Sequence, residues 1–146
     1  MEMDLKENTK QVFQQVTTAV QETGREDGSV SVIAVTKYVD IATASNLIDQ
    51  GVKHIGENRV DKFLEKYHAL SDKDVTWHLI GSLQRRKVKD IIPFVDYFHA
   101  LDSLKLAQEI QKRADRTVKC FLQVNISGEE SKHGFSKEEL LTVLPD

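Results

Sequence analysis

The sequence predicts an α/β protein with a parallel sheet, built from a chain of 146 residues. Apolar runs of strand length recur along it, the first of them from Val30 to Lys37. A segment whose apolar residues repeat with helical spacing follows each run. Residues that cap helices stand between the two kinds of segment. Strict alternation of this kind favours parallel strands joined by right-handed crossovers.

A helix is expected first, over residues 2–23, because its apolar residues fall on one stripe and Gly24 is suited to the position after a helix. Five strands are expected after it. Their bounds are Val30–Lys37, His54–Glu57, Thr76–Ser82, Tyr97–Leu101 and Lys119–Ser127.

The helices between these strands have clear start and stop signals. Asp40 is a suitable N-cap for a helix over residues 41–48, which Gly51 would end. Further helices are expected over residues 60–67 and 88–92, and Ser103 would open another over 104–114. Ser136 and Glu139 form a capping box that opens the last helix.

The alternation leaves two architectures, an open doubly wound sheet and part of a (β/α)8 barrel. Strand starts at residues 30 and 119 imply roughly 22 residues per βα unit, so eight units would need about 180 residues after the opening helix. The chain is shorter than that. It has no Gly-x-Gly-x-x-Gly after the first strand and no Gly-Lys-Ser/Thr phosphate loop. Without linkers or low-complexity tracts, residues 1–146 are expected to form a single domain.

Composition narrows the function classes. With 40% hydrophobic and 29% charged residues, the sequence is typical of a soluble globular protein. A net charge of −3 gives no electrostatic case for a nucleic-acid partner. The apolar stretches are too short for a membrane span or a signal peptide, so a cytoplasmic protein is expected. Cys120 lies in an apolar run and is interpreted as a core residue, and the five histidines lack metal-ligand spacing.

Lys37 is the strongest candidate for chemistry. It ends an apolar strand, and ligands of parallel α/β proteins bind outside the carboxyl ends of the strands. A lysine that is desolvated there has a lowered pKa and can attack a carbonyl group to form a Schiff base. On position alone, an ordinary surface lysine is the commoner case.

Other polar residues follow the later strands and are expected to face the same mouth. Asn58 follows Gly56, whose missing side chain would let backbone approach a ligand. His78 lies within the third strand, where a hydrogen-bonded core histidine is commoner than a catalytic base. Asp102 and Ser103 are as well explained as helix caps.

Five blocks of sequence stand at and after the expected strands, namely Ala34–Lys37, Ile55–Arg59, Trp77–Lys87, His99–Ser103, and Gln123–Ser127 with Ser131–Gly134. Taken together, they resemble the pyridoxal phosphate homeostasis proteins in order and spacing. The resemblance implies a barrel like the N-terminal domain of alanine racemase, which holds pyridoxal 5′-phosphate (PLP) as a Schiff base. It implies that Lys37 forms this bond and that Asn58 lies beside the pyridine ring. His78 and Lys132 are the further residues assigned to the cofactor, Lys132 as a second amine that accepts PLP transiently.

Members of that family continue through three more βα units, whose residues are expected to bind the phosphate and the pyridine nitrogen. The resemblance therefore implies an incomplete barrel here, the N-terminal two thirds, with about five of eight βα units. Its last strand would have an unpaired apolar edge, so we expect poor stability as a monomer or pairing of that edge with another chain.

The favoured function is PLP homeostasis. In this interpretation the chain holds the reactive aldehyde and passes it to PLP-dependent apoenzymes, without catalysis of its own or any catalytic residue. Three alternatives stay open. They are a fold-type III amino-acid racemase or decarboxylase, which would need a second acid/base group; a Schiff-base aldolase that uses no PLP; and an inactive fragment.

Overall fold

The computed structural model describes residues 4–129 and 133–145. Five parallel strands form one sheet in the order β1-β2-β3-β4-β5. This sequential order is that of a (β/α) barrel and contradicts the open doubly wound alternative, in which the strand order reverses at a switch point. The strands are β1 (Ala34–Val35), β2 (His54–Glu57), β3 (Thr76–Leu79), β4 (Tyr97–Leu101) and β5 (Lys119–Leu122).

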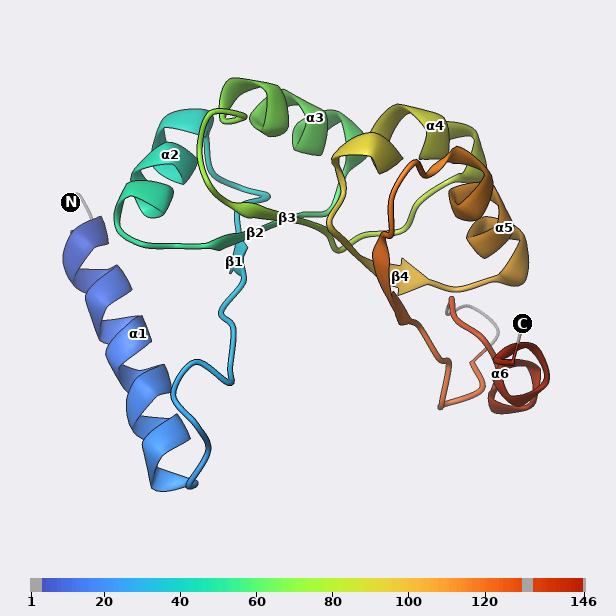
Figure 1. The fold of residues 1–146 in the computed structure, drawn as a ribbon, viewed down its shortest axis with the longest axis horizontal. Coiled ribbons are helices and arrows are strands. Elements are labelled where there is room, and N and C mark those ends of the chain that lie inside the picture. Colours follow the sequence, from blue (N-terminus) through green and yellow to red (C-terminus); the bar gives the residue numbers. More distant parts are fainter. Residues whose placement is uncertain (1–3, 130–132, 146) are drawn as a thin grey trace.

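The sheet is arched, and helices α2 to α5 cover its convex face, while α1 and α6 lie at the two ends of the arch (Figure 1). The expected caps form. Asp40, Ser103 and Ser136 each accept a hydrogen bond from a backbone N–H in the first turn of the helix that follows. The helices are α1 (Leu5–Glu22), α2 (Ile41–Asp49), α3 (Val60–Ala69), α4 (Val88–Ile91), α5 (Leu104–Arg113) and α6 (Lys137–Val143), with short 3-10 turns η1 (Arg85–Lys87) and η2 (Ile92–Phe94) on either side of α4.

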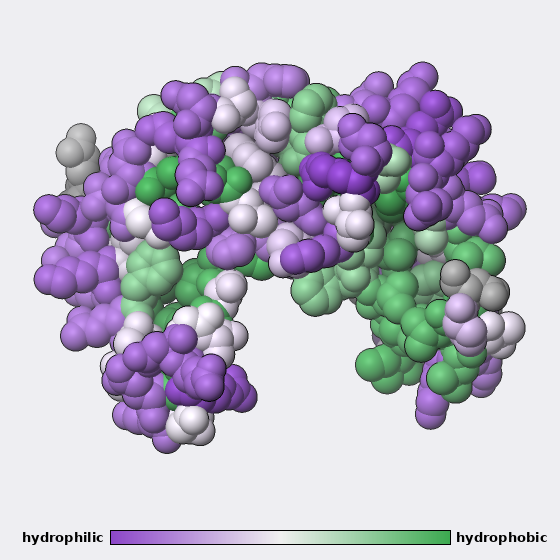
Figure 2. Space-filling model, in the orientation of Figure 1, coloured by the Kyte–Doolittle hydropathy of each residue, from purple (hydrophilic) through white to green (hydrophobic). Residues whose placement is uncertain are grey.

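The hydrophobic core lies between the sheet and the helices on its convex face. Alternate strand residues point into it, since successive side chains of a strand face opposite sides of the sheet. Ile55, Leu79 and Phe98 are inaccessible to solvent and pack with Phe63 of α3 and Val88 of α4. The other set of strand side chains lines the concave face, which is hollowed in the space-filling view (Figure 2).

The first strand differs from the expectation. Only Ala34 and Val35 pair with β2, and Val30 and Val35 are 40% and 52% exposed, so the prediction of a buried strand over Val30–Lys37 is wrong. The reason is that β1 lies at an edge and pairs with β2 alone. The third and fifth strands also end earlier than expected, and Val124 makes an isolated parallel bridge to Phe135.

None of the helices in the described part of the chain has the length and apolar character that crossing a bilayer requires. Within residues 4–129 and 133–145, no group of three or more His, Cys, Asp or Glu side chains is arranged to hold a metal ion.

Candidate cofactor site

Lys37 lies in a tight turn between β1 and α2. The turn is closed by the backbone N–H of Val39, which donates to the carbonyl oxygen of Thr36 at 3.2 Å. Before the turn, the N–H of Thr36 donates to the Gly56 carbonyl at 3.0 Å, which anchors the chain to β2. After it, Asp40 caps α2 through the N–H of Thr43 at 2.8 Å. Hydrogen bonding with the side chain of Thr43, and then with its backbone, lowers the pKa of Asp40. The backbone on both sides of Lys37 is thus fixed.

The Lys37 side chain itself is exposed, so its amine is not removed from water, in contrast to the desolvated lysine considered from the sequence. Its Nζ lies 5.1 Å from the centre of the Tyr38 ring, which is 90% exposed. Both residues line an open depression of about 470 Å³ together with residues of α2 and α3, among them Lys62 and Lys66. The amine is therefore reachable by a small carbonyl compound in solution.

Asn58 follows β2 and is half-buried. Its carbonyl oxygen would lie 2.2 Å from a Cβ atom built on Gly81, so only glycine lets the two loops approach this closely. Gly56 has a different role from the one expected for it. A Cβ there would meet side-chain atoms of Ile33 at 3.2 Å and Ile80 at 3.4 Å, so the space beside Gly56 is taken by these side chains.

Three histidines on neighbouring strands form a row on the concave face. His54 Nδ1 and His78 Nε2 are 3.0 Å apart, and His78 Nδ1 and His99 Nε2 are 2.8 Å apart. They share a face because His78 is in register with Gly56, two residues after His54, and with Tyr97, two residues before His99. His78 is thus the core-type, hydrogen-bonded histidine that its mid-strand position favours.

The row lowers the basicity of its central member. Burial, together with smaller electrostatic effects of His99 and His54, lowers the pKa of His78 to about 4. Burial also lowers the pKa of His99. The Tyr97 ring stacks on His78 with centroids 4.7 Å apart, and the Phe121 ring lies 4.8 Å from His99. At neutral pH this part of the concave face therefore presents the uncharged imidazole rings of His78 and His99 beside the aromatic rings of Tyr97 and Phe121.

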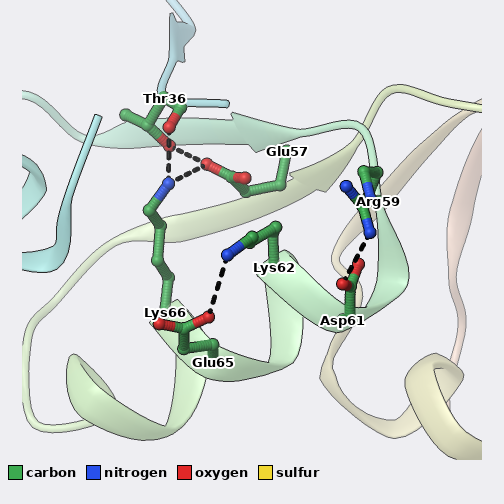
Figure 3. A network of polar contacts seen from close by, with 7 residues as sticks. All are labelled: Thr36, Glu57, Arg59, Asp61, Lys62, Glu65 and Lys66. Carbon is green, nitrogen blue, oxygen red and sulfur yellow. Dashed lines mark hydrogen bonds and ion pairs between the residues drawn. The ribbon is translucent and has the colours of Figure 1, made fainter. Parts of the chain in front are cut away.

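A buried ion pair lies behind the Lys37 turn, on the convex side of the sheet (Figure 3). Lys66 reaches from α3 so that its Nζ lies 2.8 Å from Oε2 of Glu57 at the end of β2, and the two side chains are 5% and 0% exposed. The Thr36 hydroxyl donates to the same Oε2 atom, and the Lys66 ammonium also donates to the Thr36 carbonyl. The Oε1 atom of Glu57 is buried without a hydrogen-bond partner in the described part of the chain.

Sequence reasoning did not identify this ion pair, although a signal was present. Phe63 and Tyr67 define the side of α3 that faces the core, and Lys66 lies three residues after Phe63, a spacing that puts both on one helix face. A lysine on such a face needs a buried partner, and Glu57 ends the preceding strand.

Of the residues assigned to the cofactor, Lys37 follows β1, Asn58 follows β2 and His78 lies within β3. Lys132 lies outside the described residues. Cys120 is half-buried, and burial raises the pKa of its thiol.

No family model matches the sequence. Individual proteins do. The pyridoxal phosphate homeostasis protein of Aquifex aeolicus is 38% identical over 141 residues, and that of Escherichia coli K12 is 31% identical over 143 residues. Each match covers 94% of this chain. Over nearly its whole length, this chain is similar to the pyridoxal phosphate homeostasis proteins. It spans about three fifths of the length of these curated relatives, 62% and 61%.

Solved structures of similar proteins match the fold of this chain. PipY of Synechococcus elongatus PCC7942 has been solved without PLP and with PLP bound, and it matches this chain with TM-scores of 0.76 and 0.75. The sequence identities are 33% and 32%, and each match covers 87% of this chain. An unknown protein from Bifidobacterium adolescentis gives a TM-score of 0.81 at 32% identity, over 97% of this chain and 65% of that one.

The chemistry of Lys37 and Asn58 is compatible with a ligand that carries an aldehyde on an aromatic ring, as PLP does. Lys37 offers an accessible amine on a rigid turn, and the tight approach of Gly81 to Asn58 fixes the loop after β2. When bound, PLP supplies an aldehyde that an amine can hold reversibly and a pyridine ring that withdraws electrons. Lys37 would hold the aldehyde carbon, and Asn58 has an amide that can donate or accept a hydrogen bond at the ring.

Proposed function

We propose that this chain binds PLP through Lys37 and serves intracellular PLP homeostasis. The observation that carries the proposal is the exposed Lys37 amine on a fixed turn, at the carboxyl end of the first strand of a sheet similar to that of PipY with PLP bound. In parallel α/β folds this edge of the sheet is where ligands bind. Asn58 and His78, after and within the two adjacent strands, are proposed to line the same site.

The proposed chemistry is reversible. The uncharged Lys37 amine attacks the aldehyde carbon of PLP, the new C–N bond forms, and the carbonyl oxygen leaves as water. A second amine can then take the aldehyde by exchange, with no net oxidation or reduction. The chain would thus keep a reactive aldehyde from other amines and release it to a recipient. Lys132 is proposed as such a second amine, and PLP-dependent apoenzymes in the cytoplasm as final recipients.

The test is a PLP titration followed by absorbance, with borohydride reduction and peptide mass mapping, on this chain and on Lys37→Ala. The matched control is Lys62→Ala, which removes another lysine from the same depression. We expect saturable binding, with the reduced adduct at Lys37, that is lost in Lys37→Ala and kept in the control. Unsaturable labelling spread over many lysines would overturn the proposal.

We propose a carrier rather than an enzyme, in agreement with the names of the relatives. A racemase would need a second acid/base group at the amino acid's α-carbon. His78, the histidine proposed to line the site, has its pKa lowered to about 4, chiefly by burial, so it is a poor proton donor at neutral pH. Incubation of the PLP-loaded chain with single enantiomers of amino acids tests this. Racemisation above that of free PLP would favour the enzyme.

We also propose that the chain self-associates at the end of the sheet formed by β5 and α6. In the described residues, β5 pairs with β4 alone. Phe121 and Leu122 on it are 54% and 40% exposed, and Leu144 after α6 is 58% exposed. Beside them lies a groove of about 430 Å³ between α5 and α6, lined largely by leucine and other apolar side chains. The same region is an apolar surface in Figure 2.

A further inference from the structure

Thr36, the residue before Lys37, has every one of its polar groups engaged. It is inaccessible to solvent. Its N–H donates to Gly56, and its hydroxyl donates to Glu57. Its carbonyl oxygen accepts from the N–H of Val39, which closes the turn, and from the ammonium of Lys66. Two of these four contacts come from one buried ion pair, so the pair holds the residue on which the Lys37 turn is built.

We propose that the Glu57–Lys66 ion pair is a positioning device for Lys37. It fixes Thr36 by its hydroxyl and its carbonyl, and through Thr36 it fixes the turn that presents the Lys37 amine. The inference rests on the proposed function only in taking Lys37 as the amine that binds PLP. Glu57 and Lys66 touch neither the amine nor the cofactor in this role, so they are positioning residues.

The burial of the pair is hard to explain by stability alone. Bringing two charges out of water costs free energy that their attraction offsets only in good geometry, and apolar side chains of similar size often stabilise a protein as well. Apolar side chains could fill this space, but they could not hold the hydroxyl and the carbonyl of Thr36. The ion pairs next to it, Arg59 with Asp61 and Lys62 with Glu65, have side chains 50–64% exposed, and neither is drawn with a hydrogen bond to Thr36 (Figure 3).

A single carboxylate oxygen of Glu57 accepts hydrogen bonds from both Thr36 and Lys66. This oxygen, Oε2, accepts from the Thr36 hydroxyl and from Lys66, and Lys66 also donates to the Thr36 carbonyl, so these three residues form a closed ring of contacts (Figure 3). Glu57 comes from β2 and Lys66 from α3. The end of β1 is therefore tied to the next strand and to the helix behind it. A rigid turn would let the aldehyde select Lys37 over the flexible surface lysines, because the amine needs no further ordering to be in place.

The experiment compares Thr36→Val, Lys66→Met and Lys66→Arg with the control Lys62→Met, which removes a charge one helical turn earlier on α3. The first measurement needs no PLP. It is amide hydrogen exchange at Val39, whose N–H bonds the Thr36 carbonyl, relative to exchange at the core residue Phe98. We expect Val39 to exchange about tenfold faster, relative to Phe98, in Thr36→Val and Lys66→Met. Lys66→Arg should restore much of the protection, and Lys62→Met should leave it unchanged.

The second measurement is the fraction of borohydride-trapped PLP found on Lys37 rather than on other lysines, which should fall in the same two variants. Equal loss of protection at Val39 and Phe98 would make the pair a general stabiliser and overturn the inference. Unchanged exchange at Val39 would do the same. If Lys66→Met does not fold, Thr36→Val carries the test, since it removes a hydroxyl group and keeps the shape. If the parent chain itself shows no selective labelling of Lys37, the proposed function fails, while the exchange result still decides whether the pair fixes the turn.

Discussion

The ammonium of Lys66 and the carboxylate of Glu57 meet at 2.8 Å inside the protein, and both side chains are almost inaccessible to water. The pair connects the turn after β1, which carries Lys37, to helix α3 behind the sheet. If one member of the pair were removed, water could not reach the other charge to solvate it. Each depends on the other for its solvation, which makes the pair sensitive to the loss of either member.

Lys66→Met is therefore expected to lower the free energy of unfolding by about 3–5 kcal/mol, because it leaves the Glu57 carboxylate buried without a counter-charge. The double variant Glu57→Gln with Lys66→Met should lose less, since no charge is left in the core. Urea denaturation of the single and double variants measures the difference. A single variant as stable as the parent would contradict the buried geometry.

The free energy of unfolding should decrease as the pH is lowered below about 6.5, because of His78. Its pKa in the folded protein is lowered from 6.5 to about 4, chiefly by burial and also by the neighbouring His99 and His54. Between these values the unfolded chain binds the proton and the folded chain does not, so acid favours unfolding, and above pH 6.5 this contribution disappears. We expect a loss of about 2 kcal/mol between pH 6.5 and 4, less than the whole shift corresponds to because solvent reaches the concave face.

The measurement for His78 is the free energy of unfolding at several pH values in the parent and in His78→Gln. The variant should show a shallower slope between pH 4 and 6.5. His133→Gln, which replaces an exposed histidine, serves as control and should keep the slope of the parent. Identical slopes in all three proteins would show that the row of histidines does not resist protonation.

Gly81→Ala should destabilise the loop that carries Asn58. The new Cβ would lie 2.2 Å from a backbone oxygen, which cannot move aside as a side chain can. We expect a loss of about 3 kcal/mol, against about 1 kcal/mol for Gly56→Ala, where the nearest atoms belong to the side chains of Ile33 and Ile80. Thermal unfolding of both variants tests the order, and a milder effect at Gly81 would refute it.

Self-association should weaken when a charge is placed on the exposed edge. Phe121→Glu puts a carboxylate where a 54% exposed aromatic ring now lies, and charged side chains on an edge strand oppose pairing with another chain. Light scattering over a range of concentrations should show a smaller average mass for Phe121→Glu than for the parent. Val12→Glu, on the exposed side of α1 at the other end of the arch, is the control and should behave as the parent does. A parent chain that stays monomeric throughout would count against the proposed surface.

The periodicity of the sequence predicted the order of strands and helices because local pattern determines both. His54–Glu57 and Tyr97–Leu101 were predicted with the bounds that the structure has, since turn signals and helix caps flank them. The expected strand Val30–Lys37 was wrong in length and burial, because strand pairing depends on neighbours that are distant in sequence. Lys37 and Asn58 could be found as polar residues at strand ends.

The contacts of Lys66 could not be predicted in the same way. The sequence places it on the inner side of a helix, but which carboxylate it meets depends on how α3 lies across β2. The row of three histidines likewise requires the register between strands, which no single strand encodes.

The strand order has one more consequence. Each strand pairs only with strands adjacent to it in the chain, so the contacts around the Lys37 turn join residues that are at most 30 positions apart. Loop closure over such distances is entropically cheap and fast. The turn and the ion pair that holds it can therefore assemble early, during synthesis, from the first two βα units and before the rest of the sheet is complete.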